Sequence, residues 1–221
     1  MSKRKLQRFE ELNHLERIFQ YPFPLLKTDH GLRGNWRKNI FKNDNPLILE
    51  LGCGRGEYTV EMAREYADKN FIGIDIKGAR IWRGVKSINE ENILTAAFLR
   101  THIEWLNQFF ADQEVDDIWV TFPDPQPQLT RENRRLTNSR FISLYRQVLK
   151  SNGYLHLKTD NIGLFQYTVD QLKNEQGTME ICTYDLYHDT PVGFNLSIQT
   201  TYEKIFMKKG FPIHYLKFKM E

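Results

Sequence analysis

The feature that most limits how this 221-residue chain can fold is an alternation of short apolar runs with amphipathic segments, repeated five times in its centre. Short apolar runs predict buried strands, and apolar residues spaced three to four apart predict helices. The predicted strands are 47–51, 71–76, 93–99, 117–122 and 154–159, and the helices after them begin near Tyr58 or cover 77–89, 102–110, 138–150 and 161–174. Because repeated strand–helix units form parallel sheets covered on both faces, we expect an α/β fold with a doubly wound, mostly parallel sheet.

The two ends of the chain depart from this pattern. Residues 1–45 combine charged residues with glycine- and proline-containing turns, so we expect a basic, partly irregular N-terminal arm with at most one short helix. Residues 46–221 are expected to form one domain. Within it, 179–186 and 211–218 have strand patterns with no full helix between them, which predicts a closing antiparallel pair. The expected sheet is therefore seven-stranded, with an antiparallel C-terminal strand.

Positive charge is unevenly distributed, although the net charge is only +3. Basic residues gather at 3–8, 131–140 and 204–219. These clusters could form one surface for a polyanion, because a local field does not require a large total charge. The alternative is that they are solvated helix faces. Composition by itself excludes neither an enzyme nor a binding module.

Cysteine content and hydropathy indicate the compartment in which the protein is expected. Two cysteines, Cys53 and Cys182, are too few for a disulfide framework or a zinc site built from four cysteines, so we expect a reducing compartment and no metal. The N-terminus is charged, and no apolar run approaches the roughly 20 residues that a membrane span needs. We therefore expect a cytoplasmic protein without a signal peptide or a membrane anchor.

The first predicted strand ends in Glu50-Leu51-Gly52-Cys53-Gly54-Arg55-Gly56. Ligands of a doubly wound sheet bind beyond the carboxyl ends of its strands, and alternate glycines let the backbone turn tightly beside a ligand. The spacing differs from the G-x-G-x-x-G of dinucleotide sites, and Glu50 would repel a phosphate but could pair with an ammonium group. S-adenosylmethionine carries an ammonium and a ribose but no phosphate. A tight strand–helix turn without a ligand is the structural alternative.

Two further strand ends supply candidate contacts for the same ligand. Asp75 ends the second strand, where a carboxylate can accept hydrogen bonds from both ribose hydroxyls, and its presence favours a cofactor site over a plain turn. His102 follows the third strand and could reach an adenine amino group only through a ring nitrogen. A histidine that begins a helix is the simpler interpretation. No base is apparent for Cys53, so we assign it no thiol chemistry.

The fourth strand runs into Thr121-Phe122-Pro123-Asp124-Pro125-Gln126-Pro127. Prolines on both sides of Asp124 fix the backbone and remove N–H donors, so its carboxylate would be held stiffly at the end of the strand, toward reacting atoms. A turn rich in proline is the alternative. Guanidinium groups follow that could bind phosphates in a bidentate manner, on Arg131, Arg134 and Arg135.

Two later segments complete the candidate acceptor site. Asp160 ends the fifth strand and is either a helix cap or a second carboxylate in the cleft. A carboxylate suits guanine, whose N1 and N2 groups are donors. The segment Thr200-Thr201-Tyr202-Glu203 adds hydroxyls, an aromatic ring and an acid. Tyr202 could stack on an unpaired base, as in RNA-binding proteins, or be buried in the core.

With these motifs the chain resembles the bacterial tRNA (guanine-N7)-methyltransferases. The resemblance runs from the glycine loop after Glu50 through Gly73-Ile74-Asp75-Ile76, Phe122-Pro123-Asp124-Pro125, Arg134-Arg135-Leu136-Thr137, Lys158-Thr159-Asp160-Asn161 and Thr200-Thr201-Tyr202-Glu203. It covers nearly all of the chain after the N-terminal arm. It implies a Rossmann-like class I methyltransferase fold, S-adenosylmethionine as cofactor with S-adenosylhomocysteine as product, and tRNA as partner.

The resemblance also implies roles for individual residues. Asp124 would be catalytic and would line the cofactor site with Glu50, Gly52, Gly54, Gly56, Asp75 and His102. The tRNA would be bound by Gln128, Arg131, Arg134, Arg135, Asp160, Thr200, Thr201, Tyr202 and Glu203. Two departures stand out. The family usually has Asp-Pro-Trp-Pro-Lys, whereas this chain has Gln126 and Gln128, so no substrate-binding lysine can be assigned, and His102 replaces the usual Asp or Asn. Neither change affects Asp124, which indicates a variant subgroup.

The predicted reaction is methyl transfer by direct displacement to N7 of the variable-loop guanine, tRNA position 46. Because N7 has a lone pair and no proton, alignment and charge stabilisation by Asp124 would suffice without a general base. One alternative is a methyltransferase for another nucleic-acid base or a small-molecule amine, although the aromatic residue typical of amine methylation is missing after Asp124-Pro125. The other is a non-catalytic RNA-binding protein, which predicts a broken cofactor site. No obligate protein partner is expected, and monomer and homodimer both stay open.

Overall fold

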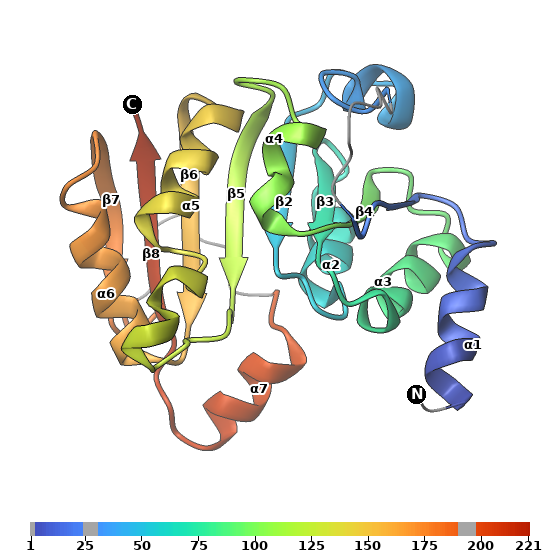
Figure 1. The fold of residues 1–221 in the computed structure, drawn as a ribbon. Helices are drawn as coiled ribbons and strands as arrows, with labels where there is room; N and C mark the ends of the chain where they lie inside the picture. The colour runs from blue at the N-terminus through green and yellow to red at the C-terminus, as the bar shows by residue number, and fades with distance from the viewer. Residues whose placement is uncertain (1–2, 24–30, 190–197) are drawn as a thin grey trace.

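The computed structural model describes residues 3–23, 31–189 and 198–221 (Figure 1). Over these residues the chain forms one eight-stranded sheet with helices on both faces. The strands are β1 Ile18–Gln20, β2 Leu47–Leu51, β3 Asn70–Ile74, β4 Ala96–Arg100, β5 Val115–Thr121, β6 Leu149–Thr159, β7 Gly177–Thr183 and β8 His214–Met220.

The strand order in the sheet is β1-β4-β3-β2-β5-β6-β8-β7. All pairs up to β6 are parallel, and β8 lies antiparallel to both β6 and β7. The predicted α/β class, the mostly parallel sheet and the antiparallel C-terminal strand are thus confirmed, whereas the sheet has eight strands and not the expected seven. The order reverses between β2 and β5, because the chain continues from β2 to β3 on one side and from β5 to β6 on the other. Sheets of this kind bind ligands at the carboxyl ends of the strands that flank such a reversal.

Helices cover both faces, which explains why the central strands are apolar on both sides. In β2, Leu47, Leu49 and Leu51 pack toward α4, α5 and α6, whereas Ile48 packs toward α2 and α3. The helices are α1 Lys3–Leu12, α2 Glu57–Glu65, α3 Gly78–Glu90, α4 Leu106–Phe109, α5 Ser139–Val148, α6 Ile162–Leu172 and α7 Thr201–Lys208, with a π-helix η1 Trp36–Phe41 and the 3-10 helices η2 Ile103–Trp105 and η3 Leu129–Arg134. The single helix predicted over 102–110 is thus two short pieces, η2 and α4.

The first 45 residues contribute more regular structure than the sequence indicated. Beside α1 and η1 they supply β1, which pairs in parallel with β4 at one edge of the sheet. The Trp36 side chain is fully buried, and its Nε1 donates a hydrogen bond to the Phe109 carbonyl oxygen (2.9 Å). On the other face, α1 packs along α3, where Trp82 Nε1 donates to Glu11 Oε2 (2.6 Å) (Figure 1). These contacts anchor the N-terminal segment to the sheet.

The segment between β7 and β8 corrects one prediction, because it contains a two-turn helix, α7, where no full helix was expected. Thr200 caps α7: its Oγ1 accepts from Glu203 N (3.1 Å), and Glu203 Oε2 accepts from Thr200 N (3.2 Å). This reciprocal capping box starts the helix despite its short length. No helix among the described residues has the length and apolar character needed to cross a membrane.

Candidate active site

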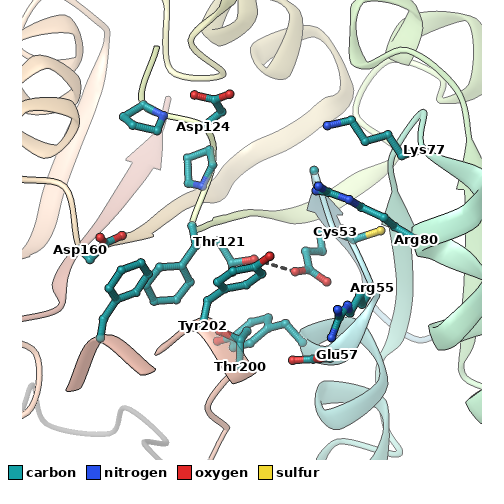
Figure 2. A pocket seen from close by; sticks show the side chains of 18 of the residues that line it. Cys53, Arg55, Glu57, Lys77, Arg80, Thr121, Asp124, Asp160, Thr200 and Tyr202 are labelled. Carbon is teal, nitrogen blue, oxygen red and sulfur yellow. Dashed lines mark hydrogen bonds between the residues drawn. The ribbon is translucent and has the colours of Figure 1, made fainter. Parts of the chain in front are cut away.

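A pocket of about 500 Å³ lies at the carboxyl ends of β2, β5 and β6, where the strand order reverses. Three distant segments line it: the glycine loop after β2, the proline stretch after β5 and the start of α7 (Figure 2). The candidate residues in its lining are Glu50, Gly52, Gly54, Asp124, Asp160, Thr200 and Tyr202. The fold therefore brings residues of the predicted cofactor and acceptor sites into one cavity.

The glycine loop has a backbone that other residues would strain. Gly54 and Gly56 have φ angles of +56° and +72°, in the left-handed region. A Cβ atom on Gly56 would lie 2.4 Å from the Phe98 ring and 3.3 Å from Gly84 Cα, whereas one on Gly54 would be nearly free of contacts. Gly54 lines the pocket, but Gly56 stands behind it at the start of α2. Gly54 thus leaves open space on the ligand side, whereas Gly56 allows α2 to pack closely against α3.

Glu50 is the buried acid of the pocket. Its side chain is held by three hydrogen bonds, from Thr121 Oγ1 (2.6 Å) to Oε1 and from Thr59 Oγ1 (2.5 Å) and Thr59 N (2.9 Å) to Oε2. Burial raises the pKa of Glu50 to about 7 and nearby Asp75 adds to the rise, while the hydrogen bonds from Thr121 and Thr59 oppose it. A buried carboxylate that is costly to ionise is poised to receive a cation.

Asp75 follows β3 directly and stands behind the glycine loop. Its Oδ2 accepts from Gly54 N (3.0 Å) and its Oδ1 accepts from Lys77 N (2.8 Å). Asp75 is not among the residues that line the pocket. In this arrangement its carboxylate braces the loop and the start of α3.

The proline stretch is held from both sides. Phe122 N donates to the Lys158 carbonyl oxygen (2.8 Å), and Arg135 donates to the Gln126 carbonyl oxygen from Nε and Nη2 (3.2 Å each). Phe122 and Gln126 have positive φ angles of 46° and 43°, so the backbone turns sharply on both sides of Pro123-Asp124-Pro125. Asp124 Oδ1 accepts from Gln126 N (3.1 Å) and the side chain is exposed to the pocket. The stiffness expected from the prolines is thus reinforced by a guanidinium clamp.

The three arginines after the prolines differ in their surroundings. Arg135 is half-buried, and its guanidinium lies 4.3 Å from the centre of the Tyr167 ring while it holds the Gln126 carbonyl. Arg131 and Arg134 are exposed on η3 and do not line the pocket, and neither does exposed Gln128. Arg135 therefore has a structural partner, whereas Arg131 and Arg134 present their charge to solvent.

A buried ion pair fixes α7 to the sheet. Lys158 of β6 and Glu203 of α7 are both fully buried, with Lys158 Nζ 2.6 Å from Glu203 Oε1. Tyr187 donates a further hydrogen bond to Glu203 Oε1 (2.6 Å), and burial lowers the pKa of Lys158 while Glu203 opposes that fall. Glu203 is thus used inside the protein and does not line the pocket. The pair holds the first turn of α7 against the end of β6.

Two residues face the acceptor side of the pocket. Asp160 lines it while Asn161 caps α6 by accepting from Leu164 N (2.8 Å), so the cap lies one position after Asp160. Tyr202 is 55% exposed and lines the pocket rather than the core. Thr201 N donates to Glu57 Oε2 (2.8 Å), which ties α7 to the start of α2 as well. Asp124 and Asp160 approach the cavity from one side and Tyr202 from α7 (Figure 2).

Some residues of the cavity were missed, and His102 joins the candidates that lie outside its lining. His102 is half-exposed beside Trp105, with their ring centres 4.6 Å apart, and is not in the lining. The missed lining residues include Arg55, Glu57, Lys77 and Arg80. The basic residues flanking Gly78 at the start of α3 were a usable signal, because that helix begins at a ligand-facing strand end.

Comparison with known proteins gives the same assignment. A family model described as "Putative methyltransferase" matches residues 44–216. A tRNA (guanine-N(7)-)-methyltransferase of Christiangramia forsetii is 47% identical over 100% of this chain and 99% of its own length. A second relative with this name, from Bacteroides fragilis, is 44% identical over 99% of this chain and 86% of its own length. A third, from Porphyromonas gingivalis, is 47% identical over 91% of this chain and 83% of its own length.

Solved structures agree on the fold at low sequence identity. The 16S rRNA methyltransferase KamB superposes with a TM-score of 0.66 at 11% identity, covering 93% of this chain and 99% of that one. A variant of the 16S rRNA (adenine(1408)-N(1))-methyltransferase of Catenulisporales acidiphilia, solved with its cosubstrate SAM, gives a TM-score of 0.61 at 13% identity and covers 89% and 93%. The fold is thus that of S-adenosylmethionine-dependent methyltransferases, and by its full-length relatives the chain belongs to the family of tRNA (guanine-N(7)-)-methyltransferases.

Proposed function

We propose that this chain transfers a methyl group from S-adenosylmethionine to N7 of a guanine in tRNA, the variable-loop guanine at position 46. The observation that carries the proposal is the convergence around one pocket of a buried acid beside the glycine loop, a carboxylate on a clamped proline stretch and an exposed tyrosine on α7. The activity is the one that the full-length relatives bear in their names.

The pocket suits the cofactor in size and charge. Its volume of about 500 Å³ is in the range of small-molecule sites. Glu50 would hold the ammonium group, and the open backbone at Gly52 and Gly54 would leave room for the chain that bears it. Asp75 would accept from the ribose hydroxyls, giving up one of its hydrogen bonds to the loop. His102 stays a candidate for the adenine side. When bound, the cofactor supplies a methyl group attached to a positively charged sulfur.

The acceptor side needs positioning more than proton transfer. Guanine N7 has a lone pair and no proton, so no residue has to act as a general base. Asp160 and Asp124 are proposed to accept from the N1 and N2 donors of the guanine and Tyr202 to stack on its ring, which fixes N7 in line for attack. The ring becomes positively charged as N7 is methylated, and the carboxylate of Asp124 on its clamped backbone would stabilise that charge.

The remaining candidates are proposed to act at the rim or from behind the site. Exposed Arg131, Arg134 and Gln128 would contact the tRNA beside the proline stretch, with Thr200 and Thr201 at the start of α7. Glu203, Arg135 and Gly56 would act by positioning, through the Lys158 ion pair, the Gln126 carbonyl and the packing of α2. With tRNA as substrate, the cytoplasm is the proposed location.

The test is transfer of labelled methyl from S-adenosylmethionine to unmodified tRNA, followed by nucleoside analysis. We expect label in 7-methylguanosine, and none when guanine 46 of the tRNA is replaced by adenine. An Asp124→Asn variant should lose turnover, whereas Asp68→Asn, an exposed carboxylate between α2 and β3, should keep it. Label in another nucleoside would move the chain to methylation of a different base. Cofactor binding without any transfer would mean that Asp124 and its prolines serve another acceptor, whereas loss of cofactor binding would favour the non-catalytic RNA-binding alternative.

A further inference from the structure

A second hollow, of about 660 Å³, adjoins the active-site pocket. The two cavities share part of their lining, and the common residues are Gly54, Arg55, Glu57, Arg80 and Tyr202. Beyond these, the second hollow is lined from α1 and α3 by Arg8, Ala79, Trp82 and Arg83. A ligand in the pocket could therefore continue into this hollow past Tyr202 without leaving the surface of the protein.

The second hollow is rich in unpaired positive charge. Its four arginines, Arg8, Arg55, Arg80 and Arg83, are all exposed, and within the described parts of the chain none of them forms an ion pair with a carboxylate. Arginines elsewhere on the surface do pair, such as Arg33 with Asp112 and Arg64 with Glu91. Guanidinium groups gathered without counter-charges raise the local potential and favour an anionic ligand.

The acid that lines this hollow is already engaged. Glu57 Oε2 accepts from the backbone N of Thr201 at the start of α7, so this carboxylate fixes α7. The same contact places Tyr202 between the two cavities. In the pocket, Arg55, Arg80 and Lys77 lie along the side opposite Asp160 (Figure 2). The guanidiniums thus lie across the pocket from Asp160, with Glu57 beside Arg55 among them (Figure 2).

The N-terminal helix is built into this surface. Trp82 of α3 donates to Glu11 of α1, and the Arg8 guanidinium lies 4.8 Å from the centre of the Trp82 ring. Arg8 Nη1 also donates to the Ala79 carbonyl oxygen (3.4 Å), which leaves most of its donors available. The docking of α1 on α3 therefore carries one basic side chain of the N-terminal segment to the edge of the active site.

We propose that this arginine hollow, formed by Arg8, Arg55, Arg80 and Arg83, binds backbone phosphates of the nucleotides next to the acceptor guanine. The inference rests on the proposed function, because it takes the acceptor to be a guanine within an RNA chain. Guanidinium groups bind phosphates in a bidentate manner, and a base stacked on Tyr202 would leave its neighbouring phosphates over the hollow. The main phosphate contacts near the base then come from α1, α3 and the glycine loop, on the side of the pocket away from Arg131 and Arg134.

The test compares two double variants that remove the same charge. Arg8 and Arg83 line the hollow but not the cofactor pocket, so Arg8→Gln/Arg83→Gln removes phosphate contacts without touching the cofactor. The control is Lys38→Gln/Lys42→Gln, two exposed lysines in η1 and just after it, at the opposite end of the sheet. Binding of unmodified tRNA is measured over a series of salt concentrations with S-adenosylhomocysteine present, and S-adenosylhomocysteine binding is measured separately by calorimetry.

For the arginine variant we expect the tRNA Kd to rise roughly tenfold and the slope of log Kd against log salt to fall by about 2, since each phosphate contact contributes about 1. Cofactor affinity should be unchanged, and the lysine control should behave like the unaltered protein. Because Arg8 also contacts Ala79 and Trp82, Arg83→Gln alone is the second variant. This single variant keeps Arg8 and therefore the docking of α1. Its slope of log Kd against log salt should fall by about 1.

Equal salt slopes in the arginine and lysine variants, with Arg83→Gln also unchanged, would overturn the proposal. Its failure is distinguishable from failure of the proposed function. Methylation at guanine N7 with unchanged salt slopes would reject the hollow but keep the activity. A lowered slope in the arginine variants without label in 7-methylguanosine would support the hollow as an RNA-binding surface and reject the activity.

Discussion

Cofactor binding should depend on pH through Glu50. Burial raises the pKa of this carboxyl to about 7 in the ligand-free protein, and the proposed partner is an ammonium group that pairs only with the ionised form. With a pKa of about 7, roughly 90% of Glu50 is protonated at pH 6 and roughly 10% at pH 8. The Kd for S-adenosylhomocysteine should therefore be about tenfold weaker at pH 6 than at pH 8.

The assay is calorimetric titration with S-adenosylhomocysteine at half-unit steps from pH 5.5 to 8, beside the variant Glu50→Gln. The variant keeps the shape of the side chain but has no charge to titrate, and the ammonium of the ligand titrates equally for both proteins. We expect the variant to bind weakly, with a Kd that is nearly constant up to pH 7.5. Over the same range the Kd of the unaltered protein should fall as the pH rises. A flat profile in both proteins, or the same slope in both, would refute the assignment of Glu50 as the titrating acid.

The same pKa shift has the opposite effect on folding stability: raising the pH strengthens cofactor binding but destabilises the fold. The pKa of Glu50 is raised from 4.5 to about 7 on folding, so its contribution to stability is full below pH 4.5 and is lost as pH rises through about 7. A shift of this size corresponds to at most about 3 kcal/mol for a fully buried group. Asp117, whose pKa burial raises to about 6, acts in the same direction. Glu50→Gln should remove the Glu50 part of the pH dependence, which urea unfolding at pH 6 and pH 8 would measure.

Three further predictions follow from the site. Asp124→Ala should lower the turnover number roughly 10²-fold or more while the cofactor Kd changes little, and equal losses in both would contradict its role at the acceptor. Glu203→Gln leaves the ammonium of Lys158 buried without a counter-charge and should lower the free energy of unfolding by about 3 kcal/mol or more in denaturant titrations, whereas an unchanged midpoint would show that the buried pair is not needed. Gly56→Ala forces a Cβ atom to within 2.4 Å of Phe98 and should lower the thermal midpoint more than Gly31→Ala, which has a similar φ of +69° but open space around it.

The sequence predicted the elements that repeat and missed those fixed by distant partners. The strands β2 to β6 were found because each is an apolar run covered on both faces. β1 was missed because its residues, Ile18–Gln20, are too few for a periodic pattern, and only pairing with β4 makes them a strand. α7 was missed although Thr200 and Glu203 have the local spacing of a capping box, because the helix is short and is fixed by the ion pair of Glu203 with Lys158, a distant link that no local pattern shows.

The candidate site shows the same division. Glu50, Asp124 and Asp160 were placed at strand ends by the topology alone, and all three line the pocket. What the sequence could not supply was the direction of each side chain. Arg135 turns inward to the Gln126 carbonyl and Glu203 turns inward to Lys158, whereas Arg55 and Arg80, which were not candidates, turn toward the cavity. The sequence shows which residues are charged, but only packing decides whether a charged side chain bonds within the protein or faces the cavity.

The position of β8 in the sheet has a consequence for the order of assembly. β8 follows β7 in the chain but lies between β6 and β7, so β7 has no strand partner until β8 has been added. The cofactor half, built on β2, β3 and β4, has no such dependence. On the ribosome, the cofactor half can therefore form while the C-terminal strands are still being synthesised. Tyr202 lies on α7 between β7 and β8, so the side of the pocket that α7 lines depends on the last strand of the chain joining the sheet.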